Sequence, residues 1–207
     1  MSQPDASPTA AIQAFWTWFQ ANEPVIQRAY DDGDTATLDA LLSPKVEEVV
    51  PGAGWEMGPY ALPSNALVFS PGVREKVAVC RDLVRAAPEI AGWTFFAAKP
   101  PKELTSLVVH VDGHEVCADR WSYRMTSYGG GEFVDLEIFF EDADSPEPAN
   151  VELAAELLIE ALVGEMISLE RIGAIDTLCV PDTSAVERAT PLRFLKNHLD
   201  QVLAPLQ

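Results

Sequence analysis

The chain has 207 residues, enough for one large domain or two small ones. Hydrophobic residues make up 48% of it, an ordinary globular fraction, so disorder as the dominant state is excluded. Thirty-two acidic and 14 basic side chains leave a formal net charge of −18. Nucleic-acid backbones and anionic membranes both attract basic surfaces, so we expect neither as a partner of this protein.

The first 51 residues predict helices. Apolar residues recur at helical spacing from a start near Ser7, and Pro24 predicts either a kink or two helices that meet near Asn22. A second helix is expected from about Thr35, with a break at Pro44.

The centre of the chain predicts strands. The strands expected from short runs between Pro and Gly residues, and from apolar alternation, are 55–62, 66–69, 93–98, 104–111, 115–125, 133–140 and 177–180. A helical pattern over 73–87 separates the second strand from the third. Asp112-Gly113 is typical of a two-residue hairpin turn, which would pair His110 with Glu115.

The pairing of strand 115–125 with strand 133–140 follows from the apolar pattern. Setting Met125 opposite Val134 keeps the apolar residues of both strands on one face of the sheet. Arg124 then lies opposite Asp135, as an exposed ion pair on the other face.

Two more helices complete the predicted fold. One covers 151–171, capped by Asn150, and the last covers 192–203. The residues of the 151–171 helix that we expect to be buried are Ala154, Leu157, Leu158, Ala161, Leu162 and Leu169. We therefore predict a single α+β domain over 1–207, with a mainly antiparallel sheet packed by the N-terminal helices and the 151–171 helix. As an alternative, residues 1–51 form a helical subdomain.

The cysteines and the N-terminus indicate a cytoplasmic protein. Cys80, Cys117 and Cys179 are odd in number and widely spaced, so buried free thiols are expected rather than disulfides. Residues 1–8 lack the cationic start and apolar core of a secretory signal, and no apolar stretch is long enough to span a bilayer.

No motif points to catalysis, so no catalytic, cofactor-binding or metal-binding residue is assigned, and no cofactor is expected. His110 and His114 should face opposite sides of their hairpin, although a metal site of His110, Glu115 and Cys117 on one face stays geometrically open. The run 129–131 is glycine-rich but lacks the following helix and the lysine of a phosphate-binding loop.

The charge distribution is the most informative feature. Between Arg124 and Arg171 there is no Lys or Arg, while twelve acids fall in that span. These acids predict either a solvated face or a surface for a basic protein. A calcium site is the third alternative, although the residue spacing of an EF-hand loop is missing. The residues we assign to a partner surface are Asp142, Asp144, Glu152, Glu156 and Glu160.

Aromatic, proline and glycine landmarks run in order along most of the chain. They are Phe15-Trp16-x-Trp18-Phe19-x-x-Asn22-Glu23, Ala87-Pro88-x-x-x-Gly92-Trp93-x-Phe95 and Gly164-Glu165. Together they resemble a family of bacterial proteins of unknown function. The resemblance implies a soluble bacterial α+β protein and brings no catalytic residues with it.

Two functions of different classes follow as hypotheses. The first is a non-catalytic binding or regulatory protein that uses its acidic face on a cationic protein, as an immunity protein neutralises a basic toxin. The alternative is an enzyme that acts on a small molecule through carboxylates in a cleft near the sheet.

Overall fold

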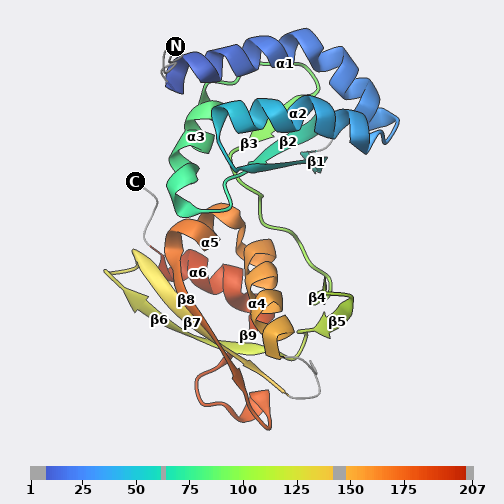
Figure 1. The fold of residues 1–207 in the computed structure, drawn as a ribbon. Coiled ribbons are helices and arrows are strands. Elements are labelled where there is room, and N and C mark those ends of the chain that lie inside the picture. The colour runs from blue at the N-terminus through green and yellow to red at the C-terminus, as the bar shows by residue number, and fades with distance from the viewer. Residues whose placement is uncertain (1–7, 62–63, 142–147, 204–207) are drawn as a thin grey trace, which may run out of the picture. The chain divides into compact units, whose positions relative to one another are not determined.

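The computed structural model describes residues 8–61, 64–141 and 148–203 and confirms the mixed α+β class. The chain divides into two compact units, Met1–Lys99 and Pro100–Gln207, and each has a hydrophobic core of its own (Figure 1). Where the sequence predicted one sheet, the described residues form three. The single domain over 1–207 stays a prediction. No helix among the described residues is long and apolar enough to cross a membrane.

The first unit packs helices on a small sheet of strand order β1-β2-β3. Its elements are α1 (Pro8–Asp31), α2 (Thr35–Val49), β1 (Gly54–Ala61), β2 (Ser64–Ser70), the 3-10 turn η1 (Arg74–Lys76), α3 (Val77–Arg85) and β3 (Trp93–Phe96). The predicted hairpin of β1 and β2 is confirmed, and β3 joins β2 in parallel. The helices α1 and α2 share one hydrophobic core with this sheet.

Two prolines lie inside helices of this unit. Ser7 falls outside the described residues, but α1 begins at Pro8 and runs through Pro24 as a single helix that bends in its second half (Figure 1). The break predicted at Pro44 is wrong, since α2 continues to Val49. The Pro44 ring is exposed, and Val46 and Val50 beyond it are buried. Burying two valines, at about 1.5 to 3 kcal/mol each, offsets the roughly 3 kcal/mol that an internal proline costs a helix.

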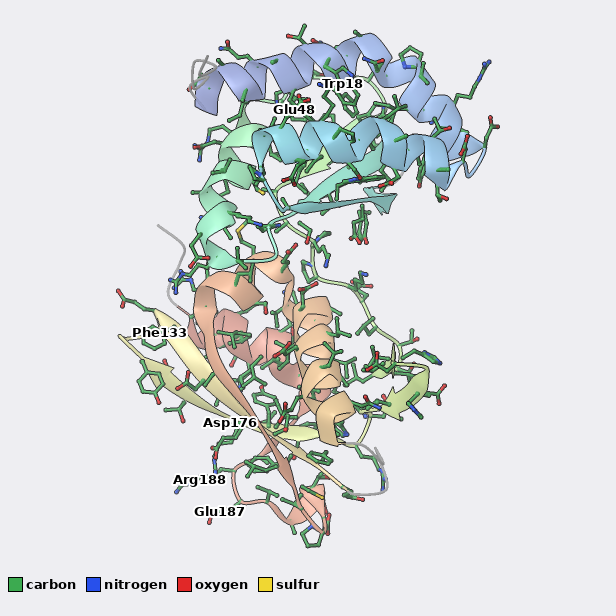
Figure 2. The ribbon with its side chains drawn as sticks, in the orientation of Figure 1. Trp18, Glu48, Phe133, Asp176, Glu187 and Arg188 are labelled. Atoms are coloured by element: carbon green, nitrogen blue, oxygen red, sulfur yellow. The ribbon has the colours of Figure 1, made fainter. Side chains whose placement is uncertain are left out.

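The core of the first unit is largely aromatic. Trp16 packs edge-on to Phe95 with ring centroids 4.6 Å apart, and Phe19 packs against Trp93 at 5.2 Å. The buried indole of Trp16 donates to the Leu83 carbonyl at 2.8 Å, which ties α1 to α3. Trp18 is half-buried against the same core, on the side of α1 that faces α2 (Figure 2).

The second unit packs helices on a four-stranded sheet of order β8-β7-β6-β9, and it holds a separate hairpin of β4 and β5. Its strands are β4 (Val108–Val111), β5 (His114–Cys117), β6 (Ser122–Tyr128), β7 (Phe133–Phe140), β8 (Ile172–Cys179) and β9 (Thr190–Pro191). Its helices are α4 (Pro148–Val163), α5 (Glu165–Arg171), the 3-10 turns η3 (Thr183–Ala185) and η4 (Leu192–Phe194), and α6 (Leu195–Val202). Figure 1 shows α4 and α6 over the same face of the sheet.

Two strand predictions need correction. The strand predicted over 115–125 is divided into β5 and β6, because the Trp121 N–H donates to the Ala118 carbonyl and turns the chain between them. The strand predicted at 177–180 is the end of the longer β8, which pairs in parallel with β7. A parallel neighbour needs a long crossover connection, and 148–171 supplies it as helix.

The predicted faces of β6 and β7 are confirmed, but the predicted residue pairs are wrong by two positions. Met125 lies opposite Leu136, and Arg124 lies opposite Glu137 rather than Asp135. The ladder continues to a last pair, Tyr128 and Phe133, whose rings stack with centroids 5.3 Å apart. Pairing Met125 with Val134 would set Tyr128 opposite Gly131 and lose that stack. Figure 2 shows Phe133 at the outer end of the hairpin.

The helix predicted over 151–171 is two helices. It breaks at Gly164, whose φ of 84° and ψ of 150° are essentially restricted to glycine. Asn150 does not cap it, because α4 already begins at Pro148. Leu157 was expected to be buried but is 40% exposed, so that prediction is wrong. Ile159, two residues further on, is buried.

Replacing Gly164 should therefore destabilise the protein. A side chain at this φ and ψ costs about 1 to 3 kcal/mol, so Gly164→Ala should lower the free energy of unfolding by that amount in urea denaturation. Gly130→Ala is the matched control, since Gly130 has a φ of 67° with no atom within 4 Å of an added Cβ. The control should cost less, and equal losses would contradict this account of Gly164.

Candidate functional site

The stretch between Arg124 and Arg171, which has no Lys or Arg, is called the cation-free span here. Arginines from outside this span compensate part of its acidic charge. Arg124 donates to both carboxylate oxygens of Glu137, at 2.7 and 3.0 Å, and these hydrogen bonds lower the pKa of Glu137. Arg120 pairs with Glu141 at 2.9 Å. The sequence predicted an ion pair of Arg124 with Asp135 instead of Glu137, and it predicted no partner for Arg120.

Two further acids of the span serve the fold. Asp135 accepts a hydrogen bond from the backbone N–H of Ala174 at 2.9 Å, which holds the start of β8 beside β7. Glu165, at the first position of α5, is 1% exposed. The uncompensated acidic surface is therefore smaller than the sequence predicted.

Three of the five acids assigned to a partner surface lie on α4. Glu152 and Glu156 are exposed and Glu160 is half-buried, while Asp142 and Asp144 lie outside the described residues. Leu153 and Leu157 are 42% and 40% exposed on the same helix. At about 100° per residue, these five side chains span an arc of roughly 140°. We call them the acidic–leucine face.

This face combines charge with exposed apolar surface. An isolated exposed leucine is ordinary, but two leucines one helical turn apart form a continuous strip beside the glutamates. The sequence analysis missed the strip because it assigned Leu157 to the core. The signal that could have found it is the spacing of Leu153 and Leu157, which repeats that of Glu152 and Glu156.

The histidines of the Asp112-Gly113 hairpin are placed as predicted. Val111 pairs with His114, His110 pairs with Glu115, and the imidazole of His110 lies 3.6 Å from the Glu115 carboxylate at the surface. Within the described part of the chain, no three His, Cys, Asp or Glu side chains are placed to hold a metal ion.

The cysteines follow the sequence prediction only in part. Cys80 is buried among the helices and sheet of the first unit, as expected. Cys117 and Cys179 are exposed, so the prediction of burial is wrong for them. Each is the last residue of its strand, and Cys117 alternates with the buried Val116. All three are free thiols in the structure.

A tyrosine–histidine pair, which sequence reasoning missed, links β6 to α6. The Tyr123 hydroxyl lies 2.8 Å from Nδ1 of His198. Tyr123 is only 1% exposed. Burial raises the pKa of Tyr123 from 10.0 to about 12, because the ionised phenolate would lose its hydration. No signal in the sequence connects these residues, which lie 75 positions apart.

Carboxylates also border a cleft at the end of the sheet, where β7 finishes and β6 begins. They are Asp119, Glu141 and Asp182. Asp119 accepts from the Leu107 N–H, and Glu141 is held by Arg120 and Thr183. The Asp182 carboxylate caps η3, and its hydrogen bonds from Ser184 lower its pKa. A general acid needs a raised pKa, which Asp182 does not have.

The sequence landmarks have structural roles in the described residues. Glu23 accepts a hydrogen bond from the Trp93 indole at 2.9 Å, so the first two landmark groups are joined to each other in the core of the first unit. The pair Gly164-Glu165 forms the break between α4 and α5. No family model, no curated protein and no solved structure matches this chain. The resemblance to a bacterial family stays a prediction.

The Tyr123–His198 pair predicts a stability change at high pH. The raised folded pKa means that stabilisation is complete below pH 10 and is lost as the pH rises toward 12. Over that window the parent should lose up to about 2 kcal/mol more than Tyr123→Phe, measured by urea denaturation at each pH. Tyr60, whose pKa is also raised to about 12, titrates in both proteins and cancels from the comparison. Parallel pH profiles for the two proteins would contradict the burial of an un-ionised Tyr123.

Proposed function

We propose that this chain is a bacterial, cytoplasmic, non-catalytic binding protein that docks a basic protein on the acidic–leucine face of α4. One observation carries the proposal, namely that Glu152 and Glu156 lie beside the exposed Leu153 and Leu157. A face that only solvates the protein has no use for two adjacent exposed leucines. A face that docks a partner uses the leucines for apolar contact and the glutamates for steering.

The overall charge supports the same proposal. At −18, the protein attracts cations at long range, and the span from Glu132 to Glu170 contributes twelve acids to that field. Such steering raises association rates by about ten- to a thousandfold at low ionic strength. A regulatory protein that neutralises a basic toxin, as an immunity protein does, would gain from fast association of this kind.

The alternative function, a small-molecule enzyme that uses carboxylates, has weaker support. The cleft that holds Asp119, Glu141 and Asp182 has the expected place near the sheet. Each carboxylate, however, has a structural partner, and the lowered pKa of Asp182 does not suit a general acid. Binding therefore explains more of the exposed surface than catalysis does.

The test compares capture of proteins from host cells by the parent and by Glu152→Gln/Glu156→Gln at low ionic strength. The double variant should be at least as stable as the parent, because like charges four residues apart on a helix cost a few tenths of a kcal/mol. A basic protein captured by the parent should bind the variant with a slower association rate. That rate should also depend less on salt, since steering is screened by ions.

Two matched variants separate position from net charge. Asp32→Asn/Glu187→Gln removes two exposed acids elsewhere and should leave capture unchanged. Leu153→Gln/Leu157→Gln keeps the charge and should increase the dissociation rate, because the apolar contact is lost. Equal capture by the parent and both α4 variants would overturn the proposal, as would the absence of any basic protein from the captured set.

A further inference from the structure

The cleft at the end of the sheet in the second unit has the size of a ligand pocket. Its volume is about 660 Å³, within the range of roughly 300 to 1,000 Å³ that is common for small-molecule sites. The start of β6, Glu141 directly after β7, η3, β9 and η4 all contribute to its wall. Five separate segments thus converge on one concave surface.

The wall contains an arginine that no carboxylate neutralises. Arg193 donates from Nη2 to the Asp119 carbonyl at 2.8 Å, and no ion pair engages its guanidinium within the described residues. Arg120, the other arginine of the wall, is paired with Glu141. Because a guanidinium has five N–H donors, Arg193 keeps several for a ligand while one bond holds it in place.

An apolar surface lies beside this arginine. Phe194 follows it directly in η4 and is 49% exposed at the wall of the cleft, and Pro191 and Trp121 extend the apolar lining. An aromatic ring with half its surface in water gains when an apolar body covers it. The cleft therefore offers one cationic group next to one apolar platform.

The charges around the cleft restrict the ligand to a single negative charge. Asp119 and Asp182 border the same cavity as the Arg120–Glu141 ion pair and would repel a doubly charged group such as a phosphate monoester. A carboxylate carries one charge, and its planar oxygens match the fork of a guanidinium.

We propose that this cleft binds a small monocarboxylate with an aromatic or apolar body. The ligand's carboxylate accepts hydrogen bonds from Arg193, and its body lies on Phe194. This site is separate from the acidic–leucine face of α4, and neither proposal depends on the other.

Benzoate is the probe, and benzamide, its uncharged analogue of the same shape, is the ligand control. In titrations followed by amide and indole NMR, benzoate should shift Ser184, Phe194 and the Trp121 indole N–H in a saturable way. Benzamide should bind at least about tenfold more weakly, as expected for the loss of one charge-assisted hydrogen bond.

The variants test the arginine and the platform separately. Arg193→Gln should weaken benzoate binding at least about tenfold, and Phe194→Ala, at an exposed position, should weaken it without disturbing the fold. Arg188→Gln is the charge-matched control, because Arg188 is exposed in the loop before β9 and pairs with Glu187 (Figure 2). It should bind benzoate like the parent.

Arg193→Gln also removes the bond to the Asp119 carbonyl, so Arg193→Lys and the Phe194 variant serve if it fails to fold. The lysine keeps the charge without the fork and should bind benzoate with intermediate affinity. Three results would overturn the proposal. They are no benzoate binding to the parent at millimolar concentrations, equal binding by the parent and the Phe194 variant, and tighter binding of inorganic phosphate at the same residues.

Discussion

The second unit depends on the pairing of β6 with β7, and the Arg124–Glu137 ion pair lies at its centre. With Arg124 opposite Glu137, the alternate residues Tyr123 and Ile138 face the core under α4. A shift by one residue would bury charged side chains and expose the apolar ones. The same pairing sets where β7 ends and β6 begins, and therefore where the cleft lies.

This pairing also decides which acids are available for other molecules. Arg124 and Arg120 neutralise Glu137 and Glu141, and Asp135 holds the start of β8. On α4, Glu152 and Glu156 are exposed beside Leu153 and Leu157. Of the twelve acids that the sequence spreads over this span, Glu152 and Glu156 thus remain exposed together on one face of α4.

The two units differ in how they satisfy buried polar groups. In the first, the indoles of Trp16 and Trp93 both find acceptors, which ties three segments into one aromatic core. In the second, the Trp121 indole N–H is buried without an acceptor among the described residues.

The sequence by itself determined the α+β class, the Asp112-Gly113 hairpin and the apolar faces of the strands. These features depend on neighbouring residues, through turn chemistry and the period of apolar residues. Only the tertiary structure decided the break at Gly164, the parallel pairing of β8, the Arg120–Glu141 ion pair, the Tyr123–His198 contact and the cleft. Each of these joins segments far apart in the chain or uses a backbone conformation that packing imposes. Local patterns carry no information about such contacts, and that is why the sequence placed Leu157 in the core.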